Sequence, residues 1–188
     1  GVEMTAYEID VILGPGINIH RSPLNGRNFE YFSEDPLLTG LMAVDQVKAL
    51  EKSGVTPVIK HFCANNRETN RREMSSTVSS RALREIYLPA FEIAIREGGC
   101  RCLMTSYNRI NDIYSACLYD QNTMILREQW GFTGLVMTDW WAKVNDENDN
   151  PCDTNLAAMV HAMNDVYMVT PDAMARKDNL PDSLAEGT

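Results

Sequence analysis

Short apolar runs alternate along the chain with longer stretches in which apolar residues recur every three or four positions. The short runs predict five strands, at residues 11–13, 57–61, 102–106, 135–138 and 165–169. The longer stretches predict amphipathic helices at residues 37–51, 79–96, 118–130 and 154–163. Pro89 lies inside the second of these helices, so we expect a kink or a break there.

Alternating strands and helices indicate parallel strands joined by right-handed crossovers. Polar residues gather just past the predicted strand ends: His20 and Arg21, Lys60 and His61, Ser106 and Tyr107, and Asp139. A doubly wound sheet would carry a glycine-rich phosphate loop after its first strand, and the sequence has none. We therefore expect an α/β fold, a (β/α)8 TIM-type barrel that is incomplete, with about five βα units present and the first strands missing.

The two ends of the sequence differ from the alternating part. Residues 1–8 resemble the end of an amphipathic helix and do not begin with methionine, so we expect a piece of a longer chain. Residues 145–153 are rich in Asn and Asp and predict a loop. We expect residues 1–176 to form the partial barrel domain and residues 177–188 to be a linker or ragged end.

Composition narrows the classes of partner. An apolar fraction of 44% supports a proper core, while no stretch approaches the roughly 20 apolar residues of a membrane span. The net charge of −9 argues against nucleic acid or an anionic membrane as a partner. Five cysteines without metal-ligand spacing predict buried free thiols, hence a reducing compartment, and with no signal peptide in this segment we expect a cytoplasmic location.

Asp139 is the most informative single residue. It ends the apolar run 135–138, where burial of a carboxylate costs desolvation energy unless the group has partners or a task. Trp140 and Trp141 follow directly, and flat indole faces suit a sugar pocket. The competing interpretation, a helix N-cap after a strand, is equally open on this run alone.

Several blocks of the sequence together resemble glycoside hydrolase family 3. The blocks are GPGINIHR (14–21), NGRNFE (25–30), FSEDP (32–36), VIKHF (58–62), SYN (106–108) and WGFTGLVMTDW (130–140). They occur in the order and at the spacing of that family, and the match runs from about residue 1 to about residue 175.

The resemblance implies a role for six residues. Asp139 is similar to the family's catalytic nucleophile, and Tyr107 to the tyrosine whose hydroxyl orients it. Arg27, Lys60 and His61 match sugar-binding positions, and Trp140 an aromatic wall of the same subsite. Arg27 and Lys60 are expected to lower the pKa of Asp139. The resemblance implies no metal ion and no organic cofactor.

Each assignment has a structural alternative. Arg27 could be a solvated loop residue, His61 could be structural, as we expect of His20 and His161, and Tyr107 could fill the barrel mouth. Other residues are expected to be structural rather than functional. Trp141 is expected to be a packing residue, and Met104 and Met137 core residues. Glu30, Glu34 and Asp35 would suit a general acid, but the run SEDP (33–36) fits helix capping better.

The resemblance also indicates what this sequence lacks. The family's general acid/base is a Glu on a second, α/β-sandwich domain, and a further sugar-binding acid lies on an earlier strand. The loop at residues 63–71 has no Asp-x-His pair, which favours the two-domain glucosidase-like branch. We expect a retaining β-glucosidase that releases terminal β-D-glucosyl residues from a β-glucoside or oligosaccharide, inactive without the rest of the enzyme. The alternative is a non-catalytic sugar-binding or degenerate module.

Overall fold

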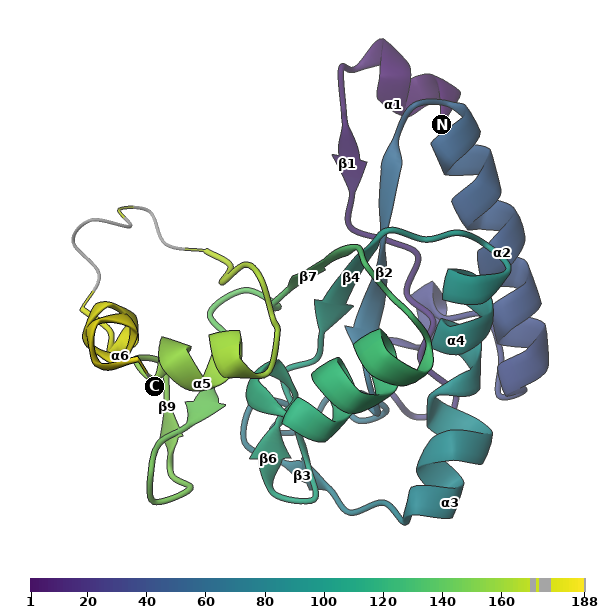
Figure 1. The fold of residues 1–188 in the computed structure, drawn as a ribbon. Helices are drawn as coiled ribbons and strands as arrows, with labels where there is room; N and C mark the ends of the chain where they lie inside the picture. The colour runs from purple at the N-terminus through teal and green to yellow at the C-terminus, as the bar shows by residue number, and fades with distance from the viewer. Residues whose placement is uncertain (170–171, 173–176, 188) are drawn as a thin grey trace.

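The computed structural model describes residues 1–169, 172 and 177–187. Its centre is a parallel sheet of four strands in the order β1-β2-β4-β7 (Figure 1). The strands span Val11–Ile12, Thr56–Phe62, Cys102–Thr105 and Leu135–Met137. Each strand pairs with the next in parallel register, so the expected βα architecture is confirmed. Among the described residues the sheet remains open, as an incomplete barrel.

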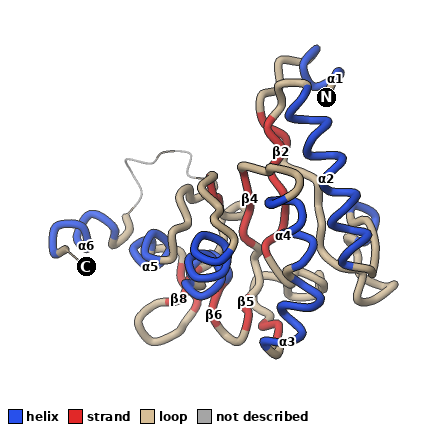
Figure 2. The backbone as a smooth tube through the Cα atoms, turned by 45° about the vertical axis from the view of Figure 1, so that its right-hand side comes forward, coloured by secondary structure: helices blue, strands red, loops and turns tan. Residues whose placement is uncertain are grey.

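Helices connect successive strands of the sheet. Helix α2 (Pro36–Lys52) links β1 to β2 and lies side by side with α4 (Pro89–Arg96), which leads into β4 (Figures 1 and 2). The π-helical segment η4 (Asp120–Gln129) links β4 to β7. These connections are the crossovers that parallel strands require.

The start of α2 shows how the sequence sets an element boundary. The Asp35 carboxylate accepts hydrogen bonds from the backbone N–H groups of Leu37 (2.8 Å) and Leu38 (3.1 Å), and Pro36 occupies the first helical position. The first backbone N–H groups of a helix have no partner within it, so the carboxylate satisfies two of them, and proline at the first position has no N–H to satisfy. The capping prediction for Asp35 is confirmed.

The break expected at Pro89 is confirmed. The predicted helix at 79–96 divides into α3 (Ser80–Ala82), the π-helical turn η2 (Leu83–Tyr87) and α4, which begins at Pro89. The proline has no N–H to donate, so a new helix begins where the ring can occupy its first turn.

The core has two layers because alternate strand residues face opposite sides of the sheet. Ile59, Leu103 and Val136 are fully buried in the cluster that packs under α2 and α4. Val58, Met104 and Met137 form a second cluster, on which Trp140 packs. Met104 and Met137 are therefore core residues, as expected.

The fifth predicted strand, at 165–169, is wrong. Val166 makes a single parallel bridge to Met137, and the Thr138 N–H donates to the Val166 carbonyl (2.9 Å), but these residues form no regular strand. The Thr138 side chain explains this, since its hydroxyl accepts the hydrogen bond (2.8 Å) from the Met168 N–H. A side chain that takes a backbone donor in this way ends regular pairing.

Smaller elements complete the structure. The remaining segments are α1 (Val2–Ala6), η1 (Asn28–Glu30), β3 (Ser75–Ser76), β5 (Arg109–Ile110), β6 (Ile113–Tyr114), η3 (Ser115–Cys117), β8 (Val144–Asn145), β9 (Pro151–Cys152), α5 (Leu156–His161) and α6 (Leu180–Glu186). Strands β3, β5 and β6 form a three-stranded sheet. No helix among the described residues is long and apolar enough to cross a membrane.

The C-terminal segments hold more structure than their composition indicates. The predicted loop at 145–153 contains the β8–β9 hairpin, so that prediction is wrong in part. Helix α6 lies in the expected linker, and Asn179 beside it donates a hydrogen bond to Asn155 Oδ1 (2.6 Å). The domain boundary expected at residue 176 falls outside the described residues, and the division stays a prediction.

Candidate functional site

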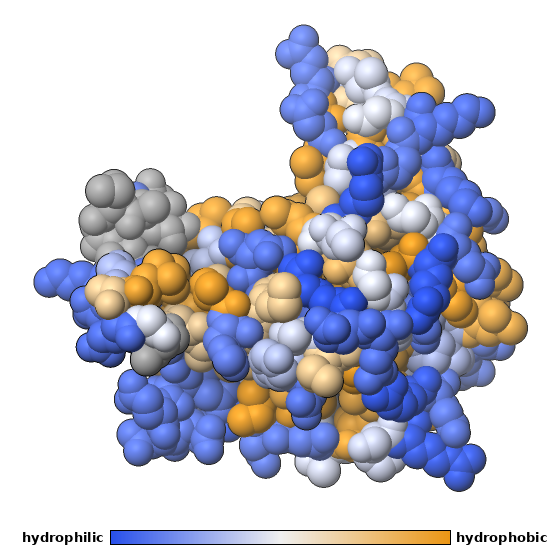
Figure 3. Space-filling view, in the orientation of Figure 1, coloured by the Kyte–Doolittle hydropathy of each residue, from blue (hydrophilic) through white to orange (hydrophobic). Residues whose placement is uncertain are grey.

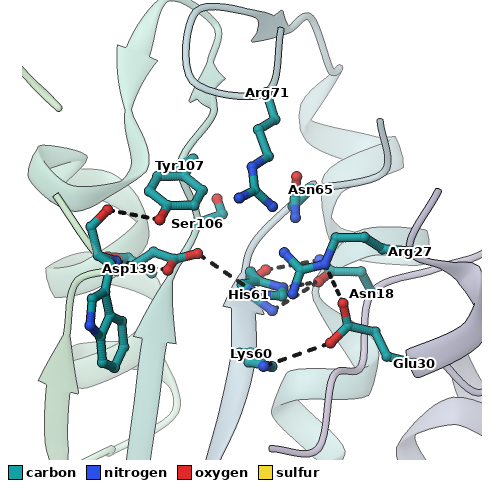
Figure 4. A network of polar contacts seen from close by, with 12 residues as sticks. Asn18, Arg27, Glu30, Lys60, His61, Asn65, Arg71, Ser106, Tyr107 and Asp139 are labelled. Atoms are coloured by element: carbon teal, nitrogen blue, oxygen red, sulfur yellow. Dashed lines mark hydrogen bonds and ion pairs between the residues drawn. The ribbon is translucent and has the colours of Figure 1, made fainter. Parts of the chain in front are cut away.

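All six residues singled out from the sequence meet around one cavity of about 180 Å³. The cavity lies beside the carboxyl ends of β2, β4 and β7 (Figure 4). Its lining consists of Leu13, Arg27, Lys60, His61, Arg71, Met104, Tyr107, Asp139 and Trp140. Sites of barrel proteins lie at this end of the strands. Larger cavities occur elsewhere in the described chain, but this one is lined by the ionisable side chains at the carboxyl ends of β2 and β7.

Asp139 is buried at the end of β7. Its Oδ1 accepts a hydrogen bond (2.7 Å) from the backbone N–H of Trp140, and its Oδ2 lies 3.8 Å from His61 Nε2. No helix begins between β7 and β8 in this described stretch, so the N-cap interpretation of Asp139 is wrong.

Burial raises the pKa of Asp139 above its ordinary value. The Trp140 N–H, the Tyr107 hydroxyl, Arg27 and Arg71 act in the opposite direction without cancelling the effect of burial. Of the two cations expected to lower the pKa of Asp139, Arg27 does so together with Arg71, while no effect of Lys60 is resolved, and desolvation outweighs the lowering.

Arg27 and Lys60 are tied together by Glu30. Glu30 Oε1 accepts a hydrogen bond from Arg27 Nε, and Glu30 Oε2 lies 3.7 Å from Lys60 Nζ. Burial acts to lower the pKa of Arg27, but the hydrogen bond to Glu30 acts in the opposite direction and helps to hold the pKa above its usual value. Glu30 thus pairs with two cations of the cavity.

His61 is almost completely enclosed, with 1% of its surface exposed. Burial lowers its pKa well below the ordinary value, and Arg27, Lys60 and Arg71 lower it further. The imidazole is consequently neutral at pH 7. Its Nε2 borders the cavity while the other edge of the ring contacts Asn18 and Tyr31.

Tyr107 is held at the end of β4 by its hydroxyl and by two arginines. The hydroxyl donates to the Trp140 carbonyl (2.7 Å), and the Cζ atoms of Arg71 and Arg72 lie 4.8 and 4.7 Å from the ring centre. Burial, and then Asp139, raises the pKa of Tyr107. The structure therefore fixes the backbone of Trp140 through Tyr107.

Trp141 does not pack, contrary to the prediction. Its side chain is 52% exposed, and its backbone has a φ of 54°. The prediction assumed an extended chain after Asp139, but the chain turns at Trp141, so the alternation of strand residues no longer applies.

Two further residues at the site, Arg71 and Asn18, were not predicted from the sequence. Arg71 comes from the polar loop after β2 and pairs with Glu68 (3.0 Å), and no periodic pattern indicates where such a loop folds. His20, which follows the first predicted strand, is not among the residues that line this cavity. His161 stacks on Tyr119 with ring centres 5.1 Å apart, in agreement with a structural role.

Other candidate chemistry is limited. All five cysteines are free thiols, but the prediction that they are buried holds for Cys63 and Cys100, whereas Cys102, Cys117 and Cys152 are partly exposed. Burial raises the pKa of Cys100 and of Cys117 to about 11. No group of three His, Cys, Asp or Glu side chains in the described part of the chain could hold a metal ion.

The fold and the cavity define the class: an α/β-barrel protein whose polar, ionisable pocket lies at the carboxyl ends of its strands. The family model "Glycosyl hydrolase family 3 N terminal domain" matches residues 1–188. The chain belongs to glycosyl hydrolase family 3, and its open sheet is part of a (β/α)8 barrel.

Named relatives agree with this family. A β-glucosidase of Ruminococcus albus is 57% identical over 187 residues, which are 100% of this chain and 20% of the relative. An exo-α-(1→6)-L-arabinopyranosidase of Bifidobacterium longum is 50% identical over 140 residues, 74% of this chain and 18% of that protein. The crystal structure of a β-glucosidase from Paenibacillus barengoltzii superposes with a TM-score of 0.95 at 50% identity, covering 98% of this chain and 21% of that one. This chain therefore spans about a fifth of the length of these relatives.

Proposed function

We propose that the protein containing this chain is a retaining β-glycoside hydrolase, a β-glucosidase, with Asp139 as its nucleophile. One observation carries the proposal. Among the described residues that line the cavity, Asp139 is the one carboxylate, and three cationic side chains, those of Arg27, Lys60 and Arg71, line the cavity with it. A retaining glycosidase needs such a carboxylate at the anomeric carbon.

The two oxygens of Asp139 have different surroundings. Oδ1 is held by the Trp140 N–H, whereas Oδ2 is the oxygen directed toward His61. In the proposed reaction Oδ2 attacks the anomeric carbon while the bond to the leaving oxygen breaks. A water molecule then hydrolyses the glycosyl–Asp139 ester, which regenerates the carboxylate.

The proton for the leaving oxygen requires a second carboxyl group. In retaining enzymes that group lies about 5–5.5 Å from the nucleophile. Since no other carboxylate lines the cavity in the described part of the chain, we assign this role to a Glu in the remainder of the enzyme. That remainder is the expected partner of this chain, which alone would not turn over substrate.

The other cavity residues would hold the sugar. Arg27, Lys60 and Arg71 can donate charge-assisted hydrogen bonds to hydroxyl oxygens. Glu30 orients the first two, so these donors are organised before substrate arrives. Trp140 offers an aromatic face beside Asp139.

Replacement of Asp139 in the full-length enzyme tests the proposal. With a 4-nitrophenyl β-D-glucopyranoside, we expect kcat/KM of Asp139→Ala and Asp139→Asn to fall by a factor on the order of 10³ or more. Asp165→Asn is the matched control, because Asp165 lies beside the opposite end of β7, where its carboxylate accepts from the Val136 N–H (2.7 Å). It should keep turnover within about threefold of the parent.

Turnover of the Asp139 variants within tenfold of the parent would sink the nucleophile assignment. Glucoside binding without turnover by the parent enzyme would favour the non-catalytic sugar-binding module instead. A parallel assay with a 4-nitrophenyl α-L-arabinopyranoside decides which glycoside is preferred, and the proposal expects the glucoside.

A further inference from the structure

The side-chain amide of Asn18 can take only one orientation. Its Nδ2 donates to the backbone carbonyl of His61 (2.8 Å), and its Oδ1 accepts from the backbone N–H of His61 (2.8 Å). A backbone N–H can only donate and a carbonyl can only accept. Turning the amide over would place donor against donor and acceptor against acceptor, so the positions of oxygen and nitrogen are settled.

This fixed oxygen also faces the His61 ring. Asn18 Oδ1 lies 3.3 Å from His61 Nδ1 (Figure 4), and both residues are at least 98% buried. An amide oxygen only accepts hydrogen bonds, so the contact is favourable only when Nδ1 carries a proton. A neutral imidazole holds one ring proton, which leaves Nε2 as an acceptor.

The other neighbour of Nδ1 does not decide the tautomer. The Tyr31 hydroxyl lies 3.3 Å from Nδ1 and can either donate or accept. Asn65 Nδ2 contacts the same hydroxyl oxygen at 3.4 Å. The Tyr31 hydroxyl can therefore pair with either tautomer of His61, whereas Asn18 Oδ1 can pair only with the tautomer protonated at Nδ1.

We propose that Asn18 is a positioning residue that holds His61 in the tautomer protonated at Nδ1, so that Nε2 accepts a hydrogen bond from a substrate hydroxyl. The inference rests on the proposed function for the identity of the ligand. His61 Nε2 and Asp139 Oδ2, 3.8 Å apart, are then two acceptors side by side. A hydroxyl bound between them must donate, while the cations across the cavity serve as donors to other hydroxyls.

Solid-state ¹⁵N NMR of the histidine-labelled full-length enzyme tests the tautomer without any turnover. The signals of His61 are assigned by difference from His61→Asn. We expect a protonated Nδ1 and an unprotonated Nε2 in the parent, and the same in Tyr31→Phe. Asn18→Leu removes the fixed acceptor and should transfer a large part of the population to the Nε2-protonated form.

Asn164→Leu is the matched control. Asn164 is as buried as Asn18 and bonds Thr105 and Ala116 but does not contact His61. It should lose stability as Asn18→Leu does, yet keep the parent tautomer. A parent protonated at Nε2, or an Asn18→Leu spectrum like the parent's, would overturn the proposal whether or not Asp139 is the nucleophile.

A kinetic test uses Asn18→Asp, which keeps an acceptor but adds a negative charge beside Nδ1. The charged groups around the ring are Asp139, Arg27, Lys60 and Arg71, with the Tyr31 hydroxyl against Nδ1. The added carboxylate favours imidazolium, whose Nε2 donates and no longer accepts. We expect kcat/KM to fall about tenfold on the acid side and to recover as the pH rises, whereas a profile parallel to the parent's would count against the proposal.

Discussion

Asp139 is a carboxylate that the fold does not stabilise as an anion. Burial raises its pKa, although one backbone N–H and several cations oppose that effect. A functional group held in an unfavourable state is typical of active sites, where stability is given up for chemistry.

The first prediction therefore concerns stability. Asp139→Asn removes the charge and keeps the shape, so at pH 7 we expect the free energy of unfolding to rise by about 1 kcal/mol. The native state binds this proton more tightly than the unfolded state, whose Asp titrates near pH 3.9. The parent thus loses stability as the pH rises from about 4 through the raised pKa, and the variant does not.

Melting temperatures of both proteins between pH 3.5 and pH 7 measure this difference. The advantage of the variant should vanish at the acid end, where Asp139 is protonated. A parent more stable than the variant at pH 7 would show that the carboxylate is stabilised after all.

The six residues that meet around the cavity could be picked out from the sequence because each ends a strand or lies within a recognisable block. The sequence did not predict Arg71 or Asn18, since the position of a loop side chain depends on contacts far away in sequence. Trp141 was misjudged because it lies at a turn, which the alternation of strand residues does not predict. The pairing of Glu30 with Lys60 likewise joins residues far apart in sequence.

At the level of elements, α2 and α4 approach each other closely at Gly40. A Cβ atom at Gly40 would lie 2.8 Å from Ile93 Cδ1 and 2.9 Å from Ile93 Cβ. Gly40 is buried within α2 and has a helical backbone conformation, so the absence of a side chain matters here because it leaves room for Ile93.

We predict that Gly40→Ala lowers the free energy of unfolding by about 1–3 kcal/mol, despite the better helix propensity of Ala. Adding Ile93→Ala removes two of the close atoms and should recover part of the loss. Gln46→Ala, at an exposed position of the same helix, should change stability by no more than about 0.5 kcal/mol. Denaturant titration of the full-length enzyme measures all three, and a neutral Gly40→Ala would contradict the close packing.

The regular elements were predicted well, because α2 and α4 bury one apolar side while β2, β4 and β7 are short apolar runs buried in the core. The fifth strand was wrong, since the competition from the Thr138 hydroxyl arises only once β7 is in place. The β8–β9 hairpin was missed because its pairing residues, Val144–Asn145 and Pro151–Cys152, carry little apolar pattern.

For the molecule as a whole, β1 is an edge strand: among the described residues no further strand pairs with its outer side. Beside and within β1, Ile9, Val11 and Leu13 are exposed by 42%, 47% and 39%. In Figure 3, hydrophobic surface borders the projecting part of the molecule in which Figure 1 places α1 and β1. An edge strand with exposed apolar side chains invites pairing with another chain.

We predict that this chain expressed alone self-associates at micromolar concentration, whereas the full-length enzyme does not. Light scattering and binding of a hydrophobic dye measure the difference. The pair Ile9→Lys and Val11→Lys should reduce association by charging the edge. Leu184→Lys, a charge added at an exposed apolar position of α6 away from that edge, is the control and should not. A monodisperse parent chain would contradict the prediction.

Trapping the covalent intermediate shows whether it forms on Asp139. The full-length enzyme is inactivated with a 2-deoxy-2-fluoro β-glucoside that carries a good leaving group and is then digested, and the masses of its peptides are measured. We expect a fluoroglucosyl adduct on the peptide that contains Asp139, and none in Asp139→Asn. An adduct on another carboxylate, or full inactivation without any adduct on the Asp139 peptide, would contradict this assignment.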